Sequence, residues 1–157
     1  MSVRVALPST EATGELSEKL KAAVREFYER GWNQGDLSVI DELFSPDYED
    51  HDAAAQTGTS GLEAARRFIE MFRAAIPDLH VAIEDQYADG STVTTRWTAS
   101  GTHEGTLIGV PASHRRVEVS GISIDRFDEE GRLVEGWGNW DGIALLRQVG
   151  ALPNTSP

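Results

Sequence analysis

The 157-residue sequence contains no cysteine, and this absence excludes disulfide bonds, thiol nucleophiles and thiolate metal sites. No apolar run approaches the roughly 20 residues that a membrane-spanning helix needs. The N-terminus also lacks the basic segment followed by an apolar one that marks a signal peptide. From these absences we expect a cytoplasmic protein with no membrane partner.

Basic side chains are scarce: 14 lysines and arginines stand against 26 aspartates and glutamates, which gives a formal net charge of −12. A chain this acidic is repelled by phosphate backbones, so we expect no nucleic acid partner. Its hydrophobic fraction of 39% is typical of globular proteins and not of disordered ones. We expect a single domain at 15–152, between a flexible tail at 1–14 and a short tail at 153–157.

The N-terminal half has the spacing of helices. Leu20, Val24 and Phe27 recur at helical intervals, and Ser17 is placed to cap the helix that carries them. The same periodicity predicts further helices, with a short strand between them. The first helix is expected to start at about residue 17 and to stop at Gly31 or Gly35. The other helices are expected at about 37–44 and 61–76, and the strand within 45–52.

In the second half the period changes to two. Leu79, Val81 and Ile83 alternate with polar residues, as in a half-buried strand, and Asp89-Gly90 is a hairpin turn signal. Strands joined by tight turns form an antiparallel meander. The fold class is therefore α+β, with a curved antiparallel or mixed sheet wrapped by about three N-terminal helices plus a short C-terminal helix. The strands are expected at 79–88, 92–105, 115–128 and 133–140, and the last helix at 142–150.

Four stretches carry a resemblance to a known family: "FYERGWNQGDLSVIDELFSPDYEDHD", "FIEMFRAAIPDLHVAIEDQYADGSTVTTRWTASGTHEG", "GVPASHRRVEVSGISIDRF" and "GRLVEGWGNWDGIALLRQVG". In order and spacing they resemble the SnoaL-like polyketide cyclases, or ester cyclases, of the nuclear transport factor 2-like superfamily. The resemblance covers about residues 18–152. It implies a cone of sheet and helices around a pocket, a homodimer, and no metal or organic cofactor.

The best-known members of this family close a ring by an intramolecular aldol condensation. An aspartate near the end of the last long strand is their general acid/base, and Gln and His on the preceding strand hold the substrate. The resemblance places the Gln and His positions at Gly121 and Ser123. It places the aspartate position at Gly138, or at Asn139 if the register slips by one, so the chain departs from the family at its acid/base position.

The stretch "DYEDHD" offers the first catalytic candidates. Asp52 corresponds to the carboxylate base of the related ketosteroid isomerases, and His51 titrates near neutral pH unaided. A carboxylate that faces an apolar pocket has a raised pKa, which suits a general base. Because alternate strand residues face opposite sides, His51 and Asp52 point inward together only if the strand ends between them. The alternative is a solvated polar cluster.

His103 and Glu135 complete the set of catalytic candidates. His103 would form a carboxylate–imidazole pair with Asp52 or His51, or else is an exposed loop residue. Glu135 replaces the missing aspartate if its side of the last strand faces inward, and is a surface residue if it faces outward. The candidate catalytic residues are His51, Asp52, His103 and Glu135.

Aromatic side chains are expected to line the pocket, where they offer area and stacking to a flat polyketide-like or terpenoid metabolite. Arg96 and Trp97 point to opposite faces of their strand, so only one of them is inside. Phe27 and Phe68 are expected to be plain core. The candidate substrate-binding residues are Tyr28, Trp32, Phe72, Trp97, Gly121, Ser123, Trp137 and Asn139.

Two further expectations concern a helix cap and metals. Asp141 directly precedes the last helix and is expected to cap it. The histidines His51, His80 and His103 do not stand at the spacing of a metal-binding motif, so we expect no metal site.

These residues support three functional hypotheses. The first is a cofactor-independent enzyme that cyclises, isomerises or dehydrates a small hydrophobic metabolite by general acid/base catalysis. The second is a non-catalytic ligand-binding protein, favoured by Gly121, Ser123 and Gly138 at the family's catalytic positions. The third is epoxide opening by water or by an internal hydroxyl, with Glu135, Asp52 and Asn139 as the acid and steering groups.

Overall fold

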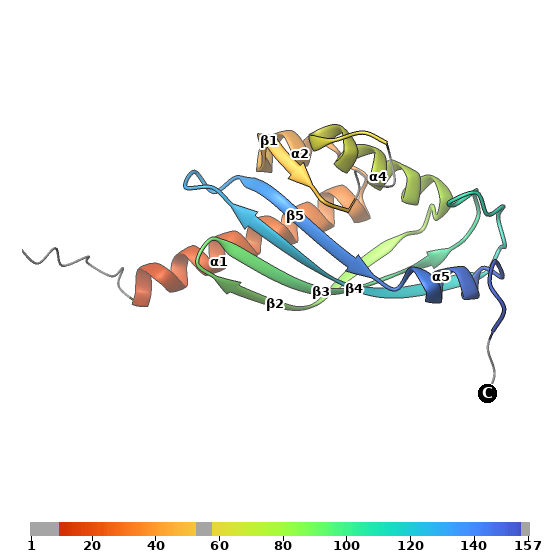
Figure 1. Cartoon of the computed structure of the whole chain (residues 1–157). Coiled ribbons are helices and arrows are strands. Elements are labelled where there is room, and N and C mark those ends of the chain that lie inside the picture. The colour runs from red at the N-terminus through yellow and green to blue at the C-terminus, as the bar shows by residue number, and fades with distance from the viewer. Residues whose placement is uncertain (1–9, 53–57, 155–157) are drawn as a thin grey trace, which may run out of the picture.

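The computed structural model describes residues 10–52 and 58–154 of the chain. Five strands form one sheet in the order β1-β5-β4-β3-β2, and the long helices pack on one face of it (Figure 1). This architecture confirms the α+β fold class expected from the sequence. Along the chain the elements are α1 (Thr10–Glu26), η1 (Phe27–Asn33), α2 (Ser38–Leu43), β1 (Phe44–Asp50), α4 (Gly61–Ala75), β2 (His80–Asp89), β3 (Thr92–Thr102), β4 (Arg116–Phe127), β5 (Leu133–Trp140) and α5 (Gly142–Gln148).

Strands β2, β3, β4 and β5 form the expected antiparallel meander. Gly90, between β2 and β3, has a φ of 57°, the left-handed conformation that a tight hairpin turn favours in glycine. Strand β1 lies at the edge and pairs in parallel with β5, so the sheet is mixed. The partners Asp50 and Gly136 in this pairing bring two distant parts of the chain together.

Helix α1 begins at Thr10, inside the segment that was expected to be a tail. Gly14 disfavours a helix by about 1 kcal/mol relative to alanine, but Glu11, Glu15 and Leu16 around it are good helix formers. The helix therefore extends farther toward the N-terminus than its apolar spacing indicated. The remainder of the two expected tails, residues 1–9 and 155–157, lies outside the described residues.

The core fills the space between the helices and the inner face of the sheet. Leu20 and Val24 of α1 and Ile69 of α4 are buried, as the helical spacing predicted. Val93 and Val117 meet them from the sheet. Among the described residues, no helix is long and apolar enough to cross a membrane.

Helix α5 follows β5 directly, and Asp141 caps its N-terminus. The backbone N–H of Ala144 donates to Oδ1 of Asp141 at 2.9 Å, which confirms the expected cap. Leu145 of this helix is buried against the core. Figure 1 shows α5 at one end of the sheet.

Removing the α5 cap is expected to destabilise the fold. Asp141→Ala should lower the free energy of unfolding by about 1 kcal/mol, because the N–H of Ala144 loses its acceptor. Asp141→Asn keeps a side-chain oxygen at the same place and is the matched control. Urea unfolding followed by circular dichroism measures both variants, and an equal loss in the two would contradict the capping role.

Candidate active site

A cavity lies between the inner face of the sheet and the helices. Its volume is about 130 Å³. One water molecule needs roughly 10–15 Å³ on the same measure, so the cavity has room for a small organic molecule. The side chains that line it come from η1, β1, α4 and all of β2 to β5, and most of them are aromatic or aliphatic.

Asp125 of β4 brings a carboxyl group into this apolar lining. Only 7% of the residue is exposed, and its Oδ2 has no hydrogen-bond partner among the described residues. Burial disfavours the charged form, and the charge of Asp50 adds to this effect, so the pKa of Asp125 is raised to about 7. Asp125 can therefore take up or release a proton near neutral pH.

Tyr48 and Asp50 of β1 stand beside Asp125. The Tyr48 hydroxyl donates to Oδ2 of Asp50 at 3.1 Å, and the backbone N–H of Asp52 donates to Oδ1 of Asp50 at 2.9 Å. Burial, and then the charges of the two aspartates, raise the pKa of Tyr48, so its hydroxyl remains a proton donor. We call Tyr48, Asp50 and Asp125 the acid cluster.

Trp97 and Tyr28 extend this polar end of the cavity through one serine. The indole N–H of Trp97 donates to Oγ of Ser123 at 3.0 Å. Ser123 also hydrogen-bonds Tyr28, whose pKa is raised by burial and by the charge of Asp125. The Trp97 ring covers Gly121, where a Cβ would come within 2.8 Å of Cε2 of the indole. The hydrogen bond to Ser123 and the lack of a side chain at Gly121 thus orient Trp97.

Two glycines of β5 leave space for side chains from β1 and the turn after it. A Cβ at Gly136 would clash with the Tyr48 hydroxyl. A Cβ at Gly138 would lie 3.1 Å from Oδ2 of Asp52. The glycine at position 138, where the family resemblance implies an acid, therefore faces a carboxylate supplied by another segment.

The structure separates His51 from Asp52, as strand alternation required. Asp52 lines the cavity. His51 lies on the outer face, where its ring stacks on Trp137 with centroids 4.8 Å apart. Its Nε2 is 2.9 Å from Oε1 of Glu135. Of the two candidates, only Asp52 is placed to meet a ligand in the cavity.

Glu135, Trp137 and Asn139 share a face of β5, as expected, but it is the outer face. Arg126 donates to Glu135, and this ion pair, with His51, lowers the pKa of the Glu135 carboxyl. Trp137 borders the cavity but is 39% exposed, and Asn139 does not line it. For Glu135 the structure therefore shows the surface alternative. The inward residues of β5 are Gly136, Gly138 and Trp140.

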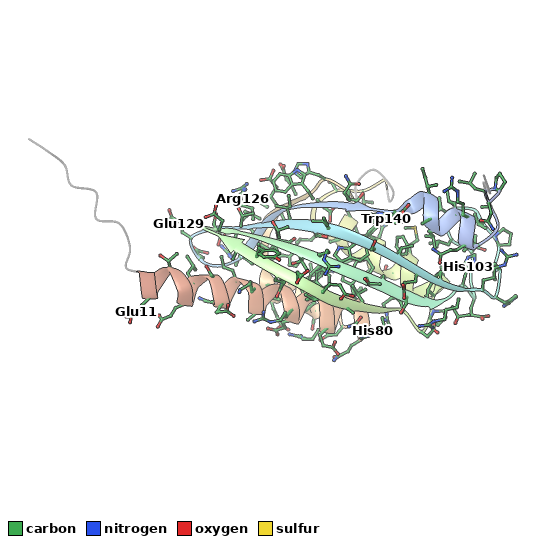
Figure 2. The ribbon with its side chains drawn as sticks, turned by 90° about the horizontal axis from the view of Figure 1, so that it is seen from below. Glu11, His80, His103, Arg126, Glu129 and Trp140 are labelled. Atoms are coloured by element: carbon green, nitrogen blue, oxygen red, sulfur yellow. The ribbon has the colours of Figure 1, made fainter. Side chains whose placement is uncertain are left out.

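The expected carboxylate–imidazole pair between His103 and Asp52 is not formed. His103 is fully buried, and its Nδ1 accepts a hydrogen bond from the backbone N–H of Ser113 at 3.1 Å. Figure 2 shows His103 at the opposite end of the sheet from Arg126, which follows Asp125 in the chain. His103 therefore fastens the loop after β3 and does not reach the acid cluster. His51, the other proposed partner, is likewise engaged elsewhere.

The aromatic candidates from the helices and from β3 do line the cavity. Trp32 packs edge-to-face on Phe68 at 5.9 Å, and Phe72 packs on Trp140 at 5.7 Å. Arg96 lies on the outer face of β3, so Trp97 is the inward member of that pair. Substrate contact stays a prediction for Tyr28, Trp32, Phe72, Trp97 and Ser123, and Phe27 and Phe68, expected as core, border the cavity with them. Gly121, the other predicted residue on these strands, is covered by the Trp97 ring and does not line the cavity.

The acid cluster was not predicted from the sequence, although strand alternation contains the signal for it. Residues two apart on a strand share a face, so Ser123 on the inner face implies the same face for Asp125. The same rule leads from Asp52 to Asp50 and Tyr48. The sequence did not show that β1 and β4 bring these groups together from either side of β5.

One group of described residues has the ligand types of a metal site. Glu49, His51 and Glu135 each place a ligand atom within 4.8 Å of the others. Arg126 already neutralises Glu135, and Glu49 and His51 are exposed on the outer face. We assign no metal to this group.

A family model and several solved structures match this chain over most of its length. Residues 22–149 match the family model of the SnoaL-like polyketide cyclases. TsrD from Streptomyces laurentii is 29% identical with a TM-score of 0.77, over 86% of this chain and 97% of TsrD. AclR from Streptomyces galilaeus is 28% identical with a TM-score of 0.76, over 89% and 86%. IdmH from Streptomyces antibioticus is 30% identical with a TM-score of 0.72, over 83% and 98%. No curated protein matches the chain.

The fit between Gly136 and Tyr48 can be tested by a double mutant. Gly136→Ala is expected to lower the free energy of unfolding by roughly 1–3 kcal/mol, because the new methyl must displace a buried hydroxyl. In a Tyr48→Phe background the nearest atom of residue 48 is a ring carbon 3.4 Å from the new Cβ, an ordinary contact. The cost of Gly136→Ala should then shrink, as measured by urea unfolding. An equal cost in both backgrounds would contradict the proposed contact.

The raised pKa of Asp125 predicts how stability depends on pH. Between the ordinary aspartate pKa and about 7 the folded protein keeps a proton that the unfolded chain has lost, so stability falls as pH rises. The fall attributable to Asp125 is up to about 4 kcal/mol and ends above its folded pKa. Asp125→Asn cannot titrate, so its stability relative to wild type should increase from pH 4 to 7. A constant difference across this range would show that the Asp125 pKa is not raised.

Proposed function

Because the chain belongs to the SnoaL-like polyketide cyclase family, we propose that it is an enzyme acting by general acid/base catalysis on a small hydrophobic metabolite, with Asp125 as the proton-transferring group. The observation that carries the proposal is a carboxyl group with a pKa near 7 inside an aromatic cavity. A general base works best when its pKa is close to the working pH. The family's acid is absent from its usual strand, and Asp125 supplies the same kind of group from the neighbouring one.

The acid cluster supports a balanced cyclisation by aldol chemistry. The Asp125 carboxylate removes a proton from a carbon next to a carbonyl group, and the resulting enolate carbon attacks a second carbonyl carbon of the same molecule. One C–C bond forms, and the new alkoxide takes the proton back from Asp125. The Tyr28 hydroxyl, which stays protonated and lines the cavity, can donate a hydrogen bond to the oxygen that gains charge. The same proton transfer without ring closure would isomerise the substrate.

The cavity lining weighs against a pure ligand carrier and changes the residues that epoxide opening would use. A pure ligand carrier needs no ionisable groups in its cavity, and Asp50, Asp52 and Asp125 all line this one. Epoxide opening remains an alternative only with new assignments, because Glu135 and Asn139 lie outside: Asp125 would protonate the epoxide oxygen and Asp50 would activate water. A homodimer and a cytoplasmic location stay predictions.

Proton abstraction can be measured without knowing the natural substrate. 1-Tetralone in D₂O exchanges its α-hydrogens slowly, and NMR follows the exchange rate with and without the protein. The wild-type protein should accelerate exchange, and Asp125→Asn should reduce the protein-dependent rate by about 10²–10⁴-fold. The rate should rise with pH toward a plateau above about 7, because the base acts in its ionised form.

Asp85→Asn is the matched control, since Asp85 is an aspartate on the outer face whose carboxylate accepts from Arg96. It should leave the exchange rate unchanged. Equal rates for wild type and Asp125→Asn, or a pH profile without a rise below 7, would reject Asp125 as the base.

A further inference from the structure

The cavity lining changes chemistry from one end to the other. Along β4 the inward residues run from Val117 and Val119, past Gly121, to Ser123 and Asp125. The acid cluster and Tyr28 surround the Asp125 end. Asp125 and Val117 are eight residues apart on the strand, which corresponds to roughly 26 Å. The two ends of the lining are therefore too far apart to contact the same part of a small ligand.

The Val117 end is aliphatic and buried. Leu145 of α5, Ile76 and Leu79 are each buried to 6% exposure or less. Ser100 is the polar residue of this end, and its hydroxyl accepts from Arg116 at 3.3 Å, on the outer side of the sheet. The side chains that form the aliphatic end are Ile76, Leu79, Val81, Ala99, Val117, Val119 and Leu145.

Trp97 lies between the two ends. Its ring covers Gly121, and its N–H is directed toward the acid side by the bond to Ser123. A ligand that reaches both ends must pass this ring, so it meets the acid cluster on one side and mainly aliphatic side chains on the other.

From this division we infer that the substrate is amphiphilic, with one carbonyl-bearing polar head at the acid cluster and an unsubstituted hydrocarbon portion in the aliphatic end. The inference rests on the proposed function for the placement of the carbonyl head. A hydroxyl buried among the aliphatic side chains would lose its water without gaining a partner, which disfavours binding. A site of this kind discriminates against polyketides that carry hydroxyl groups along their whole length.

A series of 2-alkylcyclohexanones tests the inference by binding alone. Isothermal titration calorimetry of the ethyl, butyl, hexyl and octyl compounds should show about fourfold tighter binding per added methylene until the aliphatic end is full. A hydroxyl at the far end of the hexyl chain should weaken binding at least tenfold relative to the methyl-terminated compound.

Two variants locate the effect. Ala99→Leu fills the aliphatic end, so it should abolish the gain from hexyl and octyl chains and leave ethyl binding unchanged. Val119→Thr adds a hydroxyl with little change of volume, and should narrow the preference for the methyl terminus. Ile122→Thr, on the outer face of the same strand, is the control and should change neither. Thermal unfolding confirms that each variant is folded.

The outcome is separate from that of the proposed function. Chain-length dependence should persist in Asp125→Asn, whether or not that variant exchanges deuterium. Equal binding of the hydroxyl- and methyl-terminated hexyl compounds to the wild-type protein would overturn the inference. So would an undiminished chain-length gain in Ala99→Leu together with an unchanged methyl preference in Val119→Thr.

Discussion

The burial of one carboxyl group constrains the rest of the site. Asp125 lies in a space lined by aromatic and aliphatic side chains, where its charged form is unfavourable and its protonated form is favoured. Its neighbour Asp50 adds to this effect, while hydrogen bonds from Tyr48 and from the Asp52 backbone hold that second carboxylate in place. The site thus keeps a proton near neutral pH by geometry, and the surrounding hydrocarbon preserves that condition by excluding water.

Two glycines of β5 leave the space that this arrangement needs. Strands β1 and β4 are not neighbours, since β5 lies between them. The Tyr48 side chain crosses over β5 at Gly136, and the Asp52 carboxylate lies over Gly138. A side chain at either position would separate the groups that now meet. The glycines of β5, including Gly138 at the family's acid position, therefore leave the space in which side chains from β1, from the turn after it and from β4 lie.

The sequence was informative where a local pattern decides the structure. Period-two and helical spacing predicted the strands and helices. The position of Asp141 directly before the last helix predicted its role as the N-cap of that helix. The predictions that failed depend on contacts between residues that are distant in the sequence. Whether Glu135 and Trp137 face in or out depends on what fills the space over the β5 glycines, and this comes from a strand nearly ninety residues away. The pairing of His103 failed for a similar reason, because its partner Ser113 lies on a loop whose path is fixed by tertiary contacts.

The parallel pairing of β1 with β5 also has a consequence for folding. The meander of β2 to β5 joins strands that follow one another in the chain, whereas β1 must wait for the last strand before it can pair. Contacts between distant segments carry a larger loop-closure entropy and tend to form late. The acid cluster needs that contact, so it is complete only once β1 has paired with β5. A ligand that recognises the acid cluster would accordingly report on the completeness of folding, and would hold β1 against the sheet when it binds.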